Sequence, residues 1–238
     1  MSDVVNQIQT ELRSVASKKR AEASKWYFKP EPGVVDVFLG VTVPNQRLIA
    51  KKYYRNSSIT EVEKLLHSDV HEERLTALIM WVLQYKKANE QNKKVLFDLY
   101  LENTKWINNW DLVDTSARDI VGEYLFTRDR SILTELSRSS DVWERRIAII
   151  STSYFIQCND FEWTLLLAEH YVNDTHHYIH KATGWMLREV GKRDQKVLKR
   201  FLNAHAAHMP RTMLRYAIEK FDTPTRQAYL AIKQTALQ

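Results

Sequence analysis

The sequence predicts an all-α protein, and three observations carry that prediction. The 238 residues include only 5 Gly and 5 Pro, about a third of average usage, so the chain lacks the turn residues that β-sandwiches and barrels need. Residues 45–209 contain no proline at all. Within that stretch, apolar residues recur at the i, i+3, i+4, i+7 spacing of one helix face, as in Leu75, Leu78, Ile79 and Val82.

This periodicity places the helices along the chain. One long helix is expected at 3–26. The alternating stretch from Val37 to Val43 is interpreted as an extended linker that enters a helix after Pro44, rather than as part of a sheet. Further helices are expected at 44–55, 59–67, 71–88, 92–103, 110–126, 129–138, 141–157, 160–172, 175–191, 194–204, 208–220 and 223–235.

The helices come in pairs whose second members carry similar short patterns at intervals of 31 to 40 residues. That period is typical of helical-pair solenoids, although somewhat short of the armadillo and HEAT range. We expect one domain over residues 1–238, with a helical cap at about 1–43 and repeats at about 44–235, wound as a right-handed superhelical solenoid of HEAT-like pairs. Equivalent positions then line one concave basic groove: Arg74, Asp114, Arg146, Lys181 and Thr212.

Charge and composition bound the partners. The net charge of +6 supports a polyanionic partner, although plain cytosolic proteins can be equally basic. Basic doublets are scattered along the chain, which favours a basic surface assembled by folding. A single cysteine, Cys158, allows neither an internal disulfide nor a thiolate zinc site. Without a secretory signal or a membrane-length apolar run, the protein is expected to be soluble and cytoplasmic. We also expect it to be a monomer.

Motifs for bound cofactors do not occur. The chain has no Gly-rich phosphate loop, HExxH, GxSxG or Walker pattern. His176 and His180 share a helix face and invite a metal interpretation, but no third ligand has suitable spacing. Histidines near a helix start are more often solvated or capping. We therefore expect neither a metal nor another cofactor.

Four ordered motifs carry a resemblance to a known family. They are FLGV at 38–41 with PNQR at 44–47, WDLVD at 110–114, WERR at 143–146 and GWMLRE at 184–189. With them the chain resembles, from about residue 20 to residue 221, the bacterial DNA alkylation repair proteins built from HEAT-like repeats, the alkylpurine DNA glycosylases. The resemblance implies a concave basic surface that holds duplex DNA, and excision of N3- and N7-alkylated purines in base excision repair.

The resemblance also implies which residues act. The family's catalytic carboxylate falls on Asp114, the last residue of WDLVD. Its aromatic partners fall on Trp110 and Trp185. Its arginine falls on Arg146, and a further active-site aromatic corresponds to Tyr27.

Other basic residues are candidates for DNA contacts. Arg188 resembles a phosphate contact of the family, and Lys181 is expected to contact phosphate. Arg47 and Arg74 are either solvated or phosphate-positioning. Tyr154 occupies a place where the family can carry a lysine, which puts that contact in doubt.

The implied chemistry suits these residue types. Alkylation at N3 or N7 makes a purine cationic and a good leaving group, so the general acid of ordinary glycoside hydrolysis becomes dispensable. One carboxylate, Asp114, is then sufficient to stabilise an oxocarbenium-like transition state and to orient water. Aromatic faces add cation–π attraction, and Arg146 would hold a flanking phosphate. An uncharged damaged base is expected to be a poor substrate.

Some of these residues also have a purely structural explanation. Asp114 precedes Arg118 by four residues, the spacing of an ordinary helical ion pair. Trp143 is expected in the core and Arg145 in a pair with a neighbouring acid. Two other functions are considered: a non-catalytic solenoid that recognises distorted or branched DNA, and a protein–protein scaffold. The presence of Asp114 argues against the first of these.

Overall fold

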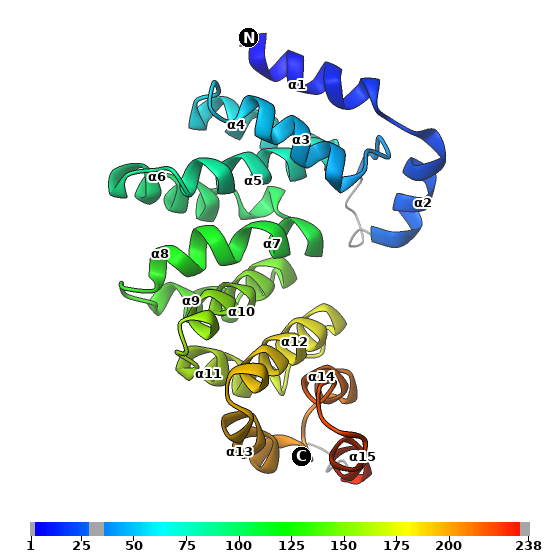
Figure 1. Cartoon of the computed structure of the whole chain (residues 1–238), viewed down its shortest axis with the longest axis vertical. Coiled ribbons are helices and arrows are strands. Elements are labelled where there is room, and N and C mark those ends of the chain that lie inside the picture. The colour runs from blue at the N-terminus through cyan, green and yellow to red at the C-terminus, as the bar shows by residue number, and fades with distance from the viewer. Residues whose placement is uncertain (1–2, 29–35, 234–238) are drawn as a thin grey trace. The chain divides into compact units, whose positions relative to one another are not determined.

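The computed structural model describes residues 3–28 and 36–233, which form α-helices joined by short connections (Figure 1). The all-α prediction is confirmed for this part of the chain. The chain divides into two compact units, Met1–Ile120 and Val121–Gln238. Within the described residues, every helix falls short of the length and apolar character that crossing a membrane requires.

The first unit consists of consecutive helices of which α5 is the most buried. Thirteen of the fifteen residues of α5 are buried, including Leu78, Met80 and Trp81 with no exposed surface. The helices α3 and α4 pack on α5, and α7 follows it as the next second member of a pair. The unit contains α1 (Asp3–Ser14), α2 (Lys18–Phe28), α3 (Val43–Tyr53), α4 (Ile59–Leu66), α5 (His71–Tyr85), α6 (Glu90–Glu102), a 3-10 turn (Thr104–Trp106) and α7 (Trp110–Ala117).

A π-helical turn, Arg118–Gly122, follows α7 and leads into the second unit. There, α10 packs against α12, and α12 packs against α14, so the second members of successive pairs stack on one another. Helices α10 and α12 begin within two residues of their expected starts at 141 and 175, whereas α14 begins at Arg211 rather than at 208. The unit contains α8 (Glu123–Leu125), α9 (Ser131–Ser137), α10 (Val142–Gln157), α11 (Glu162–Tyr171), α12 (His177–Arg193), α13 (Gln195–His205), α14 (Arg211–Ala217) and α15 (Thr223–Ala231).

The expectation of a single helix at 3–26 is wrong, because α1 ends at Ser14 and a separate helix, α2, begins at Lys18. The break lies where a distant segment crosses it: the N–H of Ser17 donates to the carbonyl of Leu39 at 2.9 Å. Gly40 then passes so close that a Cβ there would lie 2.2 Å from the Ser17 carbonyl oxygen. A continuous helix would use the Ser17 N–H itself and leave no room for this crossing.

The linker prediction for Val37 to Val43 is confirmed. Residues 36–42 are extended or irregular, with one isolated parallel bridge between Val37 and Val70. Helix α3 starts at Val43 and has Pro44 in its first turn, where a missing N–H costs nothing.

A buried carboxylate holds this linker in place. Glu72, which is 3% exposed, accepts hydrogen bonds from the backbone N–H groups of Leu39 at 3.0 Å, Gly40 at 2.7 Å and Val41 at 3.3 Å. Three donors to one carboxylate offset the cost of burying its charge. The motif at 38–41 is therefore the segment that wraps this side chain, and Gly40 reaches the required φ of 75°.

We predict that Gly40→Ala destabilises the first unit by about 1–3 kcal/mol, since it forces a side chain into the left-handed region and against the Ser17 carbonyl. Urea unfolding followed by circular dichroism measures this. The matched control is Gly191→Ala, where the nearest atom is the flexible end of Leu198. Equal losses in the two variants would contradict the role given to Gly40.

Candidate functional site

Two of the predicted aromatics lie together in the first unit. Helix α7 begins at Trp110 because the side chain of Asn109 caps it, accepting the Trp110 N–H at 2.8 Å. The Trp110 ring makes an edge contact with Tyr27, with centroids 5.8 Å apart, and stacks on Phe28 at 5.6 Å. Tyr27 itself is 67% exposed, so this aromatic cluster reaches the surface.

Asp114 follows Trp110 by one helical turn on α7 and is half-buried. The pKa of the Tyr100 phenol is raised, mainly because the group is buried and also because the negative charge of Asp114 is nearby. The Tyr100 hydroxyl lies 2.9 Å from the hydroxyl of Ser116. Asp114 therefore borders the interior of the unit and is not fully screened by water.

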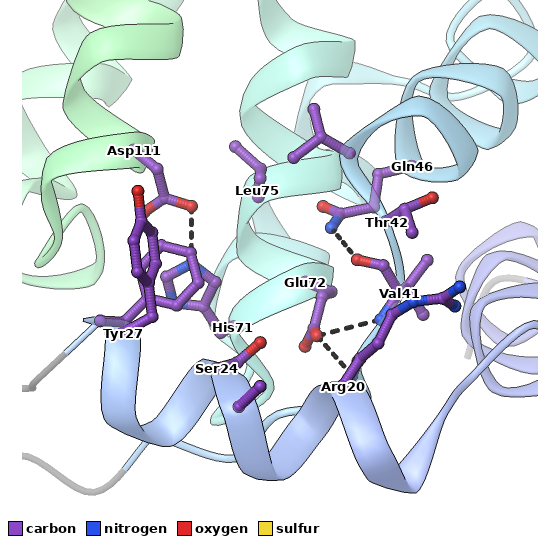
Figure 2. A pocket seen from close by; sticks show the side chains of 14 residues that line it. Arg20, Ser24, Tyr27, Val41, Thr42, Gln46, His71, Glu72, Leu75 and Asp111 are labelled. Carbon is purple, nitrogen blue, oxygen red and sulfur yellow. Dashed lines mark hydrogen bonds and ion pairs between the residues drawn. The ribbon is translucent and has the colours of Figure 1, made fainter.

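A buried ionic network joins α5 to α7. His71, the first residue of α5, lies between two carboxylates: Nδ1 is 3.2 Å from Asp36 and Nε2 is 2.8 Å from Asp111, the latter pair being visible in Figure 2. Burial alone would lower the pKa of His71, but Asp111 and Asp36 outweigh it and raise that pKa to about 9. The ring is therefore a cation at neutral pH.

Arg74 completes this network, and its surroundings fit neither of the two expectations, solvation or phosphate positioning. Its side chain is 2% exposed and pairs with Asp36 at 2.5 Å. It also donates to the Ser68 carbonyl at 2.9 Å and to the Asn108 side chain at 3.2 Å. A guanidinium enclosed by these acceptors is a structural group, so Arg74 no longer belongs among the candidate DNA contacts.

The network fixes the direction in which α7 starts. Asp111 is the second residue of α7, and it is held by a histidine that Phe28 and Phe38 flank at centroid distances of 4.7 and 5.0 Å. The Asn109 side chain also donates to the Phe28 carbonyl at 3.4 Å. These contacts orient the helix that carries Trp110 and Asp114.

A cavity of about 430 Å³ lies beside this network in the first unit. Figure 2 shows its wall, to which α2, the linker, α3, α5 and α7 all contribute. Among its lining residues are Tyr27, Gln46, His71, Glu72 and Asp111.

The remaining candidates lie in the second unit or on α3. Arg146 is 5% exposed and donates to the Tyr178 carbonyl at 2.7 Å. Trp185 is half-buried, with its indole N–H donating to Glu189 at 3.0 Å. The other predicted contacts differ in exposure: Arg188 is ion-paired with Glu219, whereas Lys181 and Arg47 are exposed.

Three structural expectations in the second unit are confirmed. Trp143 is 3% exposed and packs against Tyr178. Arg145 pairs with Asp174 at 2.9 Å. The His176 side chain caps α12.

Sequence reasoning missed four ionisable residues of the first unit: Asp36, His71, Glu72 and Asp111. A usable signal existed for two of them. His71 and Glu72 open a helix in which residues 75–83 are apolar except for Thr76, and charged groups are buried at the start of such a helix only when they are paired.

We predict that part of the stability of the first unit is lost between neutral and alkaline pH. Because the folded-state pKa of His71, about 9, lies above its ordinary 6.5, its stabilisation is complete below pH 6.5 and is lost as pH rises through 9. The difference corresponds to on the order of 3 kcal/mol. Urea unfolding at several pH values measures this loss, and NMR titration of the His71 ring measures the pKa directly.

Asp111→Asn is the comparison for this experiment. It removes the charge that does most to raise the His71 pKa, so the alkaline loss should shrink. A loss of the same size in both proteins would show that another group causes it.

Comparison with known proteins identifies the family. The chain matches the model of the DNA alkylation repair enzyme family over residues 8–221. It is similar in fold to a protein described as a predicted DNA alkylation repair enzyme from Enterococcus faecalis, at 15% identity and a TM-score of 0.71, over 87% of this chain and 97% of that one. It is also similar to AlkD2 from Streptococcus mutans, at 17% identity and a TM-score of 0.57, over 76% of this chain and 91% of that one. A search of curated proteins found no match. Because the family model covers most of the sequence, this chain belongs to the DNA alkylation repair enzyme family.

Proposed function

We propose that this protein is a DNA glycosylase that excises N3- and N7-alkylated purines from duplex DNA without a metal ion. The observation that supports it most is the arrangement on α7: a half-buried carboxylate, Asp114, one turn from Trp110, whose ring contacts the exposed Tyr27. Membership of the DNA alkylation repair family makes DNA the partner.

The proposed reaction needs little from the protein beyond charge and position. In an alkylated purine the ring is already cationic, so the C1′–N bond breaks with its electron pair passing to the base. Positive charge then grows on the sugar, and Asp114 stabilises it while water adds at C1′. Half-burial strengthens this interaction, because a carboxylate at the edge of the protein interior is screened less than one in bulk water.

Aromatic rings also stabilise the positive charge of the base and the sugar. Trp110 and Tyr27 present π-electron density close to the start of α7, where a cationic base or sugar would gain cation–π attraction of about 0.5–2 kcal/mol per ring. Arg146, Trp185 and Arg188 keep the roles in phosphate and lesion binding that the resemblance implies, as proposals. Lys181 and Arg47 are exposed, so their charges can reach a phosphate directly.

We predict that Asp114→Asn lowers the rate of 7-methylguanine or 3-methyladenine release from methylated duplex DNA at least about 100-fold, the scale of losing one electrostatic stabiliser. The control is Asp98→Asn, which removes an exposed carboxylate from the same unit and should leave the rate unchanged. Undiminished release by Asp114→Asn would remove this residue from the mechanism. If the wild-type protein binds duplex DNA tightly but releases no base, it is the non-catalytic binding protein instead.

We predict that Lys181→Ala weakens binding to duplex DNA uniformly across sequences. The slope of log affinity against log salt concentration should fall by about 1, as for the loss of one phosphate contact. Fluorescence anisotropy at several salt concentrations measures this slope. Lys64→Ala removes the same charge from an exposed position on α4, outside the predicted column, and should change affinity less. Equal effects would mean that Lys181 contributes only to net charge.

A further inference from the structure

A second cavity of the first unit, here called the α4–α6 cavity, lies at the end of α5 opposite to His71. Its volume is about 400 Å³, which falls in the range of small-molecule pockets. The loop after α3, the start of α4, the last turn of α5 and the start of α6 all contribute to its wall. Because α5 is fifteen residues long, about 20 Å separate this cavity from the His71 network.

The wall of the α4–α6 cavity carries positive charge. Arg55 and Lys87 line it, and none of the described residues in its wall is acidic. Both side chains are exposed, so a molecule in the cavity can reach their charges. The ammonium group of Lys87 makes no ion pair with a described residue. The neighbouring carboxylate of Glu61 is engaged in the cap of α4, where it accepts the N–H and the hydroxyl of Ser58 at 2.8 and 2.9 Å.

The guanidinium of Arg55 is held in place by one neighbour. Its Nε donates to the hydroxyl of Tyr54 at 2.9 Å, and its Cζ lies 5.5 Å from the centroid of the same ring. Among the described residues, its two terminal nitrogens have no further partner. A guanidinium in this state presents a planar pair of donors that matches two oxygens of one phosphate group.

The backbone acceptors around the cavity are used by the protein itself. The side-chain nitrogen of Gln84 donates to the carbonyls of Tyr54 at 3.0 Å and Ser57 at 2.8 Å. The Ser57 hydroxyl donates to the Tyr53 carbonyl at 3.0 Å, and the Lys87 N–H donates to the Gln84 carbonyl at 3.0 Å. Because these carbonyls are engaged and the two cations are not, the wall offers donors in excess. A matching ligand must therefore supply acceptors.

Charge and shape together select the class of ligand. Two cations without a carboxylate offset the desolvation of an anion, whereas a cationic ligand would be repelled. A phosphate monoester carries about 1.5 to 2 negative charges at neutral pH, which matches the two cations better than a single carboxylate does. The side chains of Ile59 and Leu96 and the ring of Tyr54 supply apolar surface for the rest of the molecule.

We propose that the α4–α6 cavity binds a small molecule that carries a phosphate monoester. Arg55 and Lys87 bind the phosphate, and Tyr54, Ile59 and Leu96 contact the body of the ligand. The site is independent of the reaction proposed for α7, because it shares no lining residue with the cavity shown in Figure 2.

The test uses the full-length protein without DNA, and the probe is adenosine 5′-monophosphate (AMP), with binding followed by isothermal titration calorimetry. Adenosine has the same body without the phosphate. We expect AMP to bind and adenosine to bind at least about tenfold more weakly, because adenosine lacks the charge-assisted hydrogen bonds. Equal affinities, or no AMP binding at millimolar concentration, would overturn the proposal.

Two variants locate the phosphate. Arg55→Gln and Lys87→Gln should each weaken AMP binding at least about fivefold and bring the affinities of AMP and adenosine closer together. Arg128→Gln is the control for Arg55, since Arg128 is also exposed and also lies over a tyrosine ring, at 4.2 Å from the centroid, but outside the cavity. Lys64→Gln, at an exposed position of α4 outside the cavity, is the control for Lys87.

AMP affinity should be unchanged in both controls. Wild-type affinity in Arg55→Gln and Lys87→Gln, or losses of equal size in the controls, would overturn the assignment to this cavity. Because both lining residues are exposed, neither variant should melt at a lower temperature than the wild type, and circular dichroism melting curves check this. A variant that melts normally and no longer binds AMP has lost the site rather than the fold.

Discussion

The first unit depends on one buried ionic interaction, in which protonated His71 is held between Asp36 and Asp111. Burying a single cation is costly, so this arrangement persists only because two carboxylates and the nearby Arg74 share a compact hydrogen-bonded network. Since Asp111 belongs to the first turn of α7, the same network that neutralises the charge also orients that helix. Stability and the placement of the candidate catalytic carboxylate therefore have a common origin.

Local sequence was sufficient to predict the helices and their repeat, because both follow from the spacing of apolar residues. The starts of α10 and α12 lie where the repeated pattern placed them. The pairing of Arg145 with Asp174 and the burial of Trp143 were also predictable, since each is the ordinary state of such a residue near a helix start. That Tyr27 and Trp110 belong to one site was implied by family resemblance alone, and the contact between their rings was not predicted.

The features that could not be predicted depend on contacts between residues far apart in the sequence. Periodicity continues through residues 15–17, and only the crossing of the linker at Leu39 and Gly40 explains why the helix stops there. Arg74 is a similar case: a basic residue near a helix start has the same local pattern whether it is solvated or buried. Its partner Asp36 lies 38 residues earlier in the sequence, just before the extended linker that starts at Val37, and no local pattern connects the two.

The way α2 is attached has a consequence for which of its residues can be substituted. Only Ala21 of that helix is buried. The start of α2 is held by the backbone of residues 38–41, which Glu72 binds, and its end by the contacts of Phe28 with His71 and Trp110. Arg20 and Ser24, which line the cavity shown in Figure 2 between these two points, therefore carry little of the folding energy. Substitutions at Ser24 or Arg20 therefore change the cavity wall while costing little thermal stability.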